Sequence, residues 1–403
     1  MLKNVVIVTE SFTVGGGASE VAIKTVKLLA SLNLYNIWLV ASGNLPRENE
    51  RIENVQYRVL PASRQSSNKN FIQGFFHKLY SFQVKKEMSL ILKNFSKADT
   101  VVHVHNWPLF SYSLYSALIE WDGAFCTTMH DYYAVCPSTN FFNYKKGKIC
   151  NCRPGSIKCL FTMCDRRSSF YKLNQDVRFI FQNQVFHLFQ KMENLIFVSD
   201  FSRKIMEPFF VHKRKVATIN NPISFKDCES TDRNDKYLFV GRLSKEKGAE
   251  LFCRAISELG LRGVVAGDGE EMKELKNKYP DIEFLGWCNR NVVQRLYQES
   301  RALIFPTLLY ETAGLAVLEA LAYKTPCIIP DKAAASQYVA HLETAVLFES
   351  GNVESLKNAI LQMENEKLRA YLEKNIGASF DKSLFSDSTY INAILKYYES
   401  LLC

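Results

Sequence analysis

Two carboxylates bracket a short apolar segment in the second half of the chain. In YETAGLAVLEALAY, residues 310–323, Glu311 and Glu319 are separated by seven residues that are small or apolar. This segment predicts a helix that begins between Glu311 and Ala313. On that helix the neighbours of Glu319 at three and four residues' distance are apolar or amphipathic: Leu315, Ala316, Ala322 and Tyr323. Because a buried carboxylate needs a polar partner, Glu319 either pairs with backbone or arginine or binds a ligand.

Two cations follow an earlier strand in the same half of the chain. In FVGRLSKEKGAE, Arg242 comes just after the strand and Lys247 where the next helix begins. Cations beside the free amides of a helix start form a cradle for pyrophosphate. The pattern is also typical of a solvated loop, because Lys and Arg are common there. The glycine turn AGDGEE after the next strand permits close backbone approach, or simply starts a helix.

The first half of the chain contributes a histidine and a glycine turn. TMHDYY places His130 at the carboxyl end of a strand. A lone histidine is more often structural, but this position favours a functional role. SFTVGGGASE has three glycines before a helix without the GxGxxG spacing of a dinucleotide site. His103 and His105 share one side of a strand, as a metal pair or, more in keeping with the pattern, as buried histidines.

Strands and helices alternate along both halves of the 403-residue chain. Valine-rich runs such as NVVIVTES and KYLFVGR predict buried parallel strands, and each is followed by a helical pattern. The length favours two domains. We predict an α/β protein with two Rossmann-like doubly wound domains facing a central cleft, because ligands of such sheets collect beyond the strand carboxyl ends. The predicted ranges are a first domain 1–219, a linker 220–235, a second domain 236–380, and a terminal helix 381–403 packing back on the first domain.

Composition narrows the class of protein. The chain has 47% hydrophobic and 23% charged residues, which is typical of globular proteins. No run approaches the roughly 18 apolar residues of a membrane span, and Glu10 interrupts the first apolar run, which favours a strand over a signal peptide. We expect a cytoplasmic protein. A net charge of +9 favours an anionic partner, while its scattered cations argue against nucleic acid.

Taken in order, six motifs resemble those of one enzyme family. They are the N-terminal GGG turn, HD after a first-half strand, VGRLSKEKG, AGDGEE, FLGW and E-TAGLAVL-E. Together they resemble the family 4 glycosyltransferases of the GT-B fold, in particular the bacterial enzymes that build surface polysaccharides. The resemblance covers nearly the whole chain, and the two glutamates with seven residues between them are its most specific part.

The resemblance assigns roles to individual residues. It implies that Arg242 and Lys247 bind the donor diphosphate, that Glu319 accepts hydrogen bonds from ribose hydroxyls, and that Glu311 contacts the donor sugar. The amides of Ala313, Gly314 and Leu315 would help to hold phosphate and sugar. Gly16 and Gly17 would let the first-domain loop approach donor and acceptor, and His130 would bond the sugar near the reacting carbon. We therefore expect His130, Glu311, Arg242 and Lys247 to be catalytic.

The same resemblance implies the reaction. A hexose-type sugar would move, with retention of configuration, from a UDP- or GDP-linked donor to a glycan or polyprenyl-diphosphate-linked acceptor. GT-B enzymes usually act without a divalent metal, and no DxD-type carboxylate pair follows a strand in this sequence. We therefore assign no metal ligand. Neither glutamate is assigned as a covalent nucleophile. The alternatives are a GT-B nucleotide-sugar epimerase and a non-catalytic or zinc-bearing binding protein.

A cysteine-rich and basic insertion lies at about 136–167, outside the motifs. Cys136, Cys150, Cys152, Cys159 and Cys164 have the spacing C-x-C-x6-C-x4-C after the first, unlike a C-x2-C zinc knuckle. Structural zinc, free thiols and redox pairing all remain open. The insertion also contains the basic residues Lys145, Lys146, Lys148, Arg153, Arg166 and Arg167. They suit a polyprenyl-diphosphate acceptor, or form a solvated basic loop.

A second stretch mixes aromatic and basic residues. Residues 68–95 place Phe71, Phe75, Phe76, Tyr80 and Phe82 near Lys78, Lys85 and Lys86. At helical spacing this pattern predicts either an interfacial helix resting on the inner membrane or a first-domain helix with its aromatics in the core.

Overall fold

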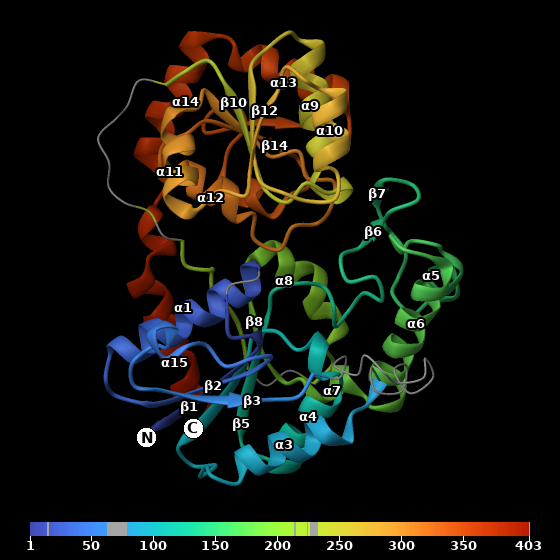
Figure 1. The fold of residues 1–403 in the computed structure, drawn as a ribbon, viewed down its shortest axis with the longest axis vertical. Helices are drawn as coiled ribbons and strands as arrows, with labels where there is room; N and C mark the ends of the chain where they lie inside the picture. The colour runs from blue at the N-terminus through green and yellow to red at the C-terminus, as the bar shows by residue number, and fades with distance from the viewer. Residues whose placement is uncertain (14–15, 63–78, 213–214, 224, 226–232, 403) are drawn as a thin grey trace.

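The protein was described from a computed structural model that covers residues 1–403. The structure describes residues 1–13, 16–62, 79–212, 215–223, 225 and 233–402. Two lobes lie one above the other along the long axis, with the amino-terminal lobe below and the carboxyl-terminal lobe above in Figure 1.

A seven-stranded parallel sheet forms the centre of the amino-terminal lobe. Its strand order is β3-β2-β1-β4-β5-β8-β9. The strands are β1 (Asn4–Ser11), β2 (Asn36–Ser42), β3 (Val55–Val59), β4 (Thr100–Val104), β5 (Ala124–Met129), β8 (Asn194–Phe197) and β9 (Lys215–Thr218). All five residues of β4 are buried, because helices cover both faces of the sheet.

The carboxyl-terminal lobe has a six-stranded parallel sheet of order β12-β11-β10-β13-β14-β15. The strands are β10 (Tyr237–Val240), β11 (Gly263–Ala266), β12 (Glu283–Gly286), β13 (Ala302–Ile304), β14 (Cys327–Pro330) and β15 (Val346–Phe348). In both sheets the chain first adds strands on one side of a central strand and then on the other side. This is the doubly wound arrangement expected from the sequence. The predicted two-sheet α/β fold is therefore confirmed.

Helices flank both sheets. In the amino-terminal lobe they are α1 (Gly17–Ser31), α3 (Phe82–Leu92), α4 (Ser113–Trp121), α5 (Ile157–Phe161), α6 (Ser169–Ile180), α7 (Leu188–Lys191) and α8 (Asp200–Met206). In the carboxyl-terminal lobe they are α9 (Ala249–Glu258), α10 (Met272–Lys278), α11 (Arg290–Glu299), α12 (Leu315–Ala322), α13 (Val353–Met363) and α14 (Glu366–Ser379). Among the described helices, none combines the length and apolar character needed to cross a bilayer.

The last helix returns to the first lobe. Helix α15 (Asp387–Leu401) lies beside α1 at the left of the lower lobe in Figure 1. Its buried Tyr390, Ile394 and Tyr398 join the apolar core that β1, β2 and α1 form. The Tyr390 hydroxyl lies 2.7 Å from Thr25 Oγ1 on α1, so both apolar and polar contacts hold the helix there.

Helix α12 begins later than the sequence predicted. It starts at Leu315, because Gly314 adopts a left-handed conformation with φ of +71° and precedes the helix as its N-cap. The expected start between Glu311 and Ala313 is therefore wrong. Residues 311–314 instead form a loop, which leaves the Glu311 carboxylate free of helical geometry.

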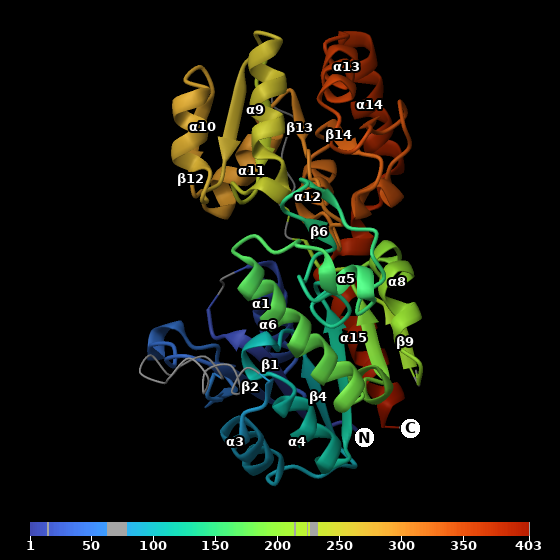
Figure 2. The ribbon, with the colours of Figure 1, turned by 90° about the vertical axis from the view of Figure 1, so that its right-hand side faces the viewer.

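The insertion between β5 and β8 forms a small antiparallel hairpin followed by α5 and α6. The hairpin strands are β6 (Phe142–Asn143) and β7 (Lys148–Ile149), and they lie at the right of Figure 1, beside the lower part of the carboxyl-terminal lobe. In Figure 2 the label of β6 lies just below that of α12. The five cysteines of the insertion are all free thiols, and the described residues contain no group of three or more side chains placed to hold a metal ion.

The aromatic and basic stretch is described only from residue 79 onward. Phe71, Phe75, Phe76 and Lys78 lie outside the described residues. In the described part, α3 turns Val84 and Met88 into the core, and Lys85 pairs with Glu120 at 2.7 Å. This part packs as a first-lobe helix, while Phe82 at its start is exposed.

Candidate active site

A recess of about 440 Å³ lies between the two lobes. Residues just beyond the carboxyl ends of β5, β10 and β13 line it, which is where ligands of open α/β sheets bind. The amino-terminal lobe contributes Gly17 and His130. From the carboxyl-terminal lobe come Arg242, Lys247, Glu311, Ala313, Gly314 and Leu315. Eight of the predicted site residues therefore meet around one recess.

Gly16 and Glu319 do not line this recess. Gly16 is the N-cap of α1 and directly precedes Gly17, and its carbonyl accepts the Glu20 N–H at 3.0 Å. Glu319 lies on α12, one helical turn beyond Leu315. Both residues are thus next to the recess rather than in its wall.

Lys247 and Glu311 form a short ion pair in the wall of the recess. Lys247 Nζ lies 2.5 Å from Glu311 Oε1, and the Thr307 hydroxyl donates to the same oxygen at 3.2 Å. Lys247 follows β10 in a short turn, whereas Glu311 follows β13, so the two neighbouring strand ends bring them together. In this partly buried site, the ammonium can bind a phosphate group and the carboxylate can accept hydrogen bonds from sugar hydroxyls.

Arg242 reaches the recess while a buried carboxylate holds its guanidinium. Arg242 Nη2 donates to Glu246 Oε1 at 2.8 Å, and the Glu246 side chain is almost wholly buried. Arg242 itself is mostly exposed. Glu246 therefore positions a cation whose remaining donors point to open space.

The free amino end of α12 is also directed at the recess. The amides of Val317 and Leu318 bind the Gly314 carbonyl at 3.0 and 3.3 Å, which leaves the amides of Leu315 and Ala316 at the helix start. Those two residues line the recess. Free amides and the positive end of a helix favour an anion such as diphosphate.

Thr312 connects this loop to the other lobe. Its hydroxyl donates to the His130 carbonyl at 2.8 Å, and its own carbonyl accepts from Ser199 Oγ at 2.5 Å. These two bonds hold the loop that contains Glu311 against the carboxyl ends of β5 and β8. The recess wall is therefore fixed across the lobe boundary.

His130 is a neutral hydrogen-bonding group. Burial lowers the pKa of His130 to about 3, so the imidazole is uncharged at neutral pH. Its Nε2 lies 3.0 Å from His105 Nδ1, and among the described residues its Nδ1 has no partner. Such a ring can bond a sugar hydroxyl without adding charge.

The other two histidines of this region are structural. His103 has both ring nitrogens bonded, to Tyr398 at 2.6 Å and to Thr128 at 2.7 Å. Burial lowers the pKa of His103 to about 3 and places that of His105 well below its ordinary value. Neither belongs to a metal-binding group among the described side chains.

Glu319 is a partly buried carboxyl group with one hydroxyl partner. The Tyr297 hydroxyl on α11 donates to Glu319 Oε2 at 3.2 Å. Burial raises the pKa of Glu319 to about 7, against the opposing charge of Arg290. The polar partner that the sequence required is therefore a tyrosine, and one that approaches from another helix.

Two glycines of the recess differ in what an added methyl group would meet. At Gly314 a Cβ would lie 2.9 Å from the Ala335 Cβ, in a left-handed conformation. We expect Gly314→Ala to destabilise the fold by about 1–3 kcal/mol. At Gly17 a Cβ would meet nothing within 4 Å, so Gly17→Ala should leave stability unchanged and weaken ligand binding by filling the recess.

Thermal unfolding and nucleotide titration of both variants would check this contrast. A Gly314→Ala protein as stable as wild type, or a Gly17→Ala protein with undiminished binding, would contradict the geometry of the recess.

Several residues of the recess were not predicted from the sequence. Asp131, Asn221, Gly241 and Thr312 line it as well. Asp131, Gly241 and Thr312 directly adjoin predicted residues, so a wider window around each motif would have included them. Glu246 likewise adjoins Lys247 and lies four residues after Arg242, so the same wider window would have included it. Asn221 and the positioning residue Tyr297 reach their places through the tertiary fold, for which no local pattern exists.

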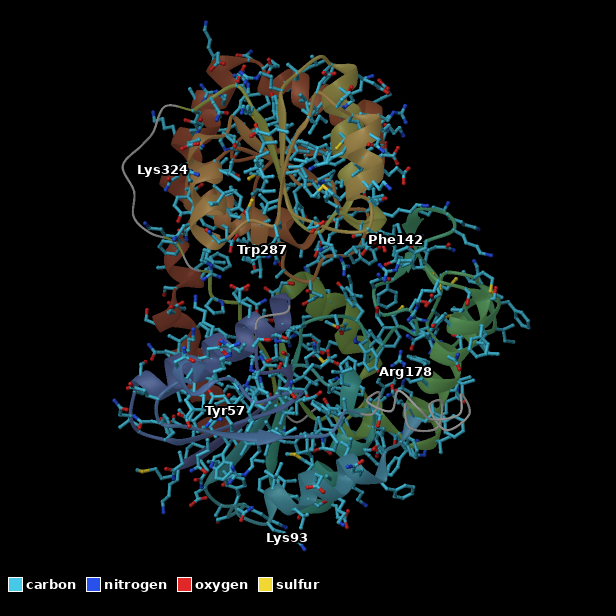
Figure 3. All side chains as sticks on the ribbon, viewed as in Figure 1. Tyr57, Lys93, Phe142, Arg178, Trp287 and Lys324 are labelled. Atoms are coloured by element: carbon cyan, nitrogen blue, oxygen red, sulfur yellow. The ribbon has the colours of Figure 1, made fainter. Side chains whose placement is uncertain are left out.

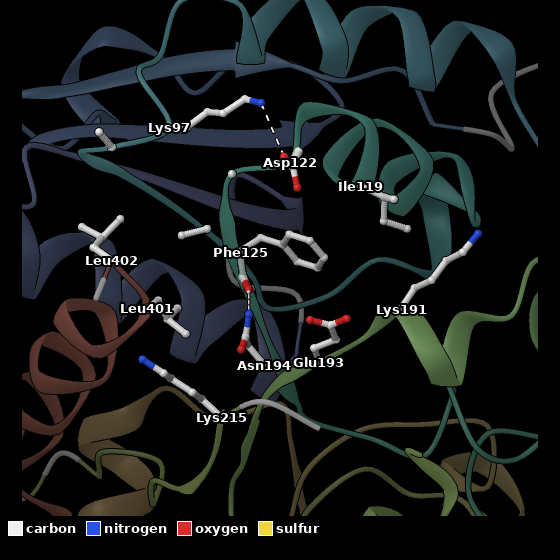
Figure 4. A pocket seen from close by; sticks show the side chains of 13 residues that line it. Lys97, Ile119, Asp122, Phe125, Lys191, Glu193, Asn194, Lys215, Leu401 and Leu402 are labelled. Carbon is white, nitrogen blue, oxygen red and sulfur yellow. Dashed lines mark hydrogen bonds and ion pairs between the residues drawn. The ribbon is translucent and has the colours of Figure 1, made fainter. Parts of the chain in front are cut away.

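A second recess, of about 560 Å³, lies at the opposite end of the first sheet (Figure 4). The amino ends of β5, β8 and β9 form it together with Leu401 and Leu402, and Lys97, Lys191 and Lys215 stand at its walls. It is the larger of the two. Its position at amino strand ends, away from the α12 amides, makes it the weaker candidate for the donor site.

Comparisons with known proteins identify the family. The model described as Glycosyltransferase Family 4 matches residues 15–226, and that of Glycosyl transferases group 1 matches residues 221–378. An uncharacterized glycosyltransferase of Methanocaldococcus jannaschii is 29% identical over 170 residues, 41% of this chain and 48% of the relative.

Two further proteins are similar over different spans. The UDP-Gal:alpha-D-GlcNAc-diphosphoundecaprenol alpha-1,3-galactosyltransferase of Escherichia coli is 29% identical over 34% of this chain and 39% of that enzyme. This chain thus spans less than half the length of either curated relative. Anabaena HepE, solved with UDP-glucose, is 14% identical with a TM-score of 0.68, covering 98% of this chain and 99% of HepE. At 14% sequence identity, this similarity shows a shared fold and no more.

The family model of residues 15–226 covers more than half of the chain, and the two facing sheets have the matching architecture. The protein therefore belongs to glycosyltransferase family 4 and has the GT-B fold.

Proposed function

We propose that the protein is a retaining glycosyltransferase that moves a hexose-type sugar from a UDP- or GDP-linked donor to a lipid-linked glycan during surface polysaccharide synthesis. One observation carries the proposal: Arg242, Lys247 and the free amides of α12 converge on one recess that faces His130. The donor diphosphate would lie against this positive wall, with the ribose toward Glu319.

The chemistry follows from the charges in the recess. Breaking the bond between the sugar C1 and the diphosphate oxygen leaves negative charge on the diphosphate. Arg242, Lys247 and the amides would stabilise that charge as it develops. Glu311 would position the sugar hydroxyls, and neutral His130 would bond the sugar near C1. The acceptor hydroxyl would attack from the face that the diphosphate leaves, and its proton would pass to the departing phosphate.

The basic insertion would bind the acceptor beside the donor. Lys245 Nζ donates to the Tyr144 carbonyl at 3.1 Å, and Arg166 Nη1 donates to both carboxylate oxygens of Glu270 at 3.2 Å. These contacts hold the hairpin over the loops that follow β10 and β11. Lys145 and Arg167 line a small recess there, where an acceptor diphosphate would find positive charge.

The names of similar proteins support this choice of substrates. The Escherichia coli relative is named for transfer from UDP-Gal to a diphosphoundecaprenol-linked sugar, and HepE was solved with UDP-glucose. We propose the same two substrate classes here, with the protein in the cytoplasm and in peripheral contact with the membrane. No divalent metal is required in this scheme.

Release of nucleoside diphosphate from UDP-, GDP- and ADP-hexoses in the presence of EDTA tests the proposal. We expect one base to be preferred, and the anomeric configuration of the donor to persist in the product by NMR. An epimerase would instead convert the free donor sugar, and a binding protein would bind nucleotide without turnover. Absence of both turnover and nucleotide binding would refute the proposed function.

A further inference from the structure

The buried and exposed faces of helix α6 have the reverse of the polarity that is usual for a surface helix. Residues 169–185 form α6 and the single π-helical turn Phe181–Val185 that continues it. A surface helix normally buries its apolar stripe and exposes its polar one. Here the polar stripe is buried and the apolar stripe is exposed.

The inner face of α6 is polar and bonded. Lys172 and Arg178 are only 1% and 4% exposed. Lys172 forms an ion pair with buried Asp176. The Arg178 guanidinium donates to the carbonyls of Tyr133 and Pro137 and to Gln182 Oε1 at 2.8 Å. Arg178 lies on the flank of the lower lobe in Figure 3. These partners fix the rotation of the helix, because exposing this face would give up every one of them.

The outer face of α6 is apolar over its whole length. Exposed side chains follow one another at helical spacing: Phe170, Leu173, Phe181 and Val185, with partly buried Val177 between them. Leu173 is 59% exposed and Val185 is 52% exposed. Helix α5 adds Ile157 and Phe161 on the same flank of the lobe, 77% and 80% exposed (Figure 1). We call these six exposed residues the apolar flank.

The surroundings of the apolar flank are positively charged. Between residues 140 and 191 the chain has ten Lys or Arg and only two acidic residues, Asp165 and Asp176. Asp176 is buried against Lys172, and Asp165 is bound by Arg167 at 3.1 Å. Arg153 and Lys158 are exposed and have no carboxylate partner in the described part of the chain. Exposed apolar side chains beside unpaired cations match the chemistry of an anionic lipid surface.

We propose that the apolar flank docks the protein on an anionic lipid bilayer. The insertion that forms this flank also bonds the donor-side loops through Tyr144 and Arg166. Docking would therefore place the mouth of the recess close to the lipid surface, where a lipid-linked acceptor resides. The apolar flank gives the peripheral membrane contact of the proposed function a specific surface, and the consequence for a lipid-linked acceptor rests on the proposed transferase activity.

Vesicle flotation tests the docking surface without any sugar nucleotide. The wild-type protein should float with vesicles of phosphatidylcholine containing about 30% phosphatidylglycerol, and less with pure phosphatidylcholine. Replacing two residues of the flank, Phe161→Ser with Leu173→Ser, should lower the partition coefficient about tenfold or more, because each buries a large apolar side chain in the interface. Arg153→Ala with Lys158→Ala should weaken binding to the anionic vesicles and reduce its salt dependence.

A matched control comes from the other lobe. Leu361→Ser with Tyr371→Ser removes two comparably exposed apolar side chains from α13 and α14, and should leave flotation unchanged. Wild-type protein that does not float, or flank and control variants that float alike, would overturn the proposal. So would a wild-type dimer in sedimentation that the flank variant converts to monomer, since a second copy would then cover the flank. Nucleoside diphosphate release without vesicles is measured separately, so a failed transferase assay leaves the docking result standing.

Discussion

Lys247→Ala is expected to lower the kcat of sugar transfer by about 100- to 1000-fold, the effect typical of removing one charge-stabilising group from an active site. Lys247 is held at the recess by Glu311 at 2.5 Å, next to the amides of α12. The loss should appear mainly in kcat, because in the proposed reaction negative charge on the diphosphate would grow as the sugar leaves. Initial rates with saturating donor measure it.

A second ion pair provides the control for this variant. Lys278 also lies 2.5 Å from a glutamate, Glu250, but on the exposed surface of the same lobe. Lys278→Ala should leave kcat unchanged, and thermal unfolding should show that both variants are folded. A folded Lys247→Ala protein with kcat within about threefold of wild type would contradict the assigned charge stabilisation.

Glu319→Gln is expected to change the pH dependence of two quantities, the free energy of unfolding and the affinity for nucleotide. The pKa of this carboxyl group is about 7 in the folded protein and 4.5 ordinarily. Between these values the folded state retains a proton that the unfolded state has lost, so the free energy of unfolding falls as pH rises from about 4.5 to 7. This part of the decline should disappear in Glu319→Gln. Denaturant unfolding between pH 5 and 8 measures it.

The same substitution should weaken nucleotide binding. In the proposed donor complex, ribose hydroxyls would donate to the ionised carboxylate, so affinity for the nucleoside diphosphate should rise as pH increases through about 7 in wild type. Glu319→Gln should bind about 10- to 100-fold more weakly at pH 8, the usual loss for a hydrogen bond to a charged group. Calorimetry measures the affinity of both proteins for the nucleotide. Because the nucleotide titrates in the same way in both experiments, the difference between the two proteins reports on Glu319 alone.

Tyr297→Phe provides the matched control for Glu319. It removes the hydroxyl that donates to the carboxylate at 3.2 Å and that lowers its pKa. The decline in the free energy of unfolding should therefore extend to higher pH in Tyr297→Phe. Unchanged pH profiles in both variants, together with wild-type affinity in Glu319→Gln, would rule out the assigned role.

The sheets were predictable because their strands are buried on both faces. Continuous apolar runs such as β1 and β4 indicate such strands directly. The edge strands β3 and β9 have partly exposed residues and mixed composition, so no apolar run indicated them. The start of α12 depended on the left-handed Gly314, and a glycine within an apolar segment does not by itself reveal its φ angle.

The gathering of most candidate residues around one recess was predictable from the sequence, and their contacts were less so. Strand ends placed His130 at the carboxyl edge of the first sheet, and Arg242 and Lys247 at the carboxyl edge of the second, where open α/β sheets bind ligands. The partner of Glu319 was not predictable, since Tyr297 comes from another helix. Helix α6 shows a further limit: hydrophobic spacing identifies an apolar stripe, but tertiary contacts decide whether that stripe faces the core or, as with Leu173, the solvent.

A structure of the protein with the nucleoside diphosphate that calorimetry selects from UDP, GDP and ADP would test the proposed donor site most directly. We expect the diphosphate between Arg242, Lys247 and the amides that start α12, with the ribose hydroxyls on Glu319. A nucleotide bound instead among Lys97, Lys191 and Lys215, in the recess at the opposite end of the first sheet, would contradict it.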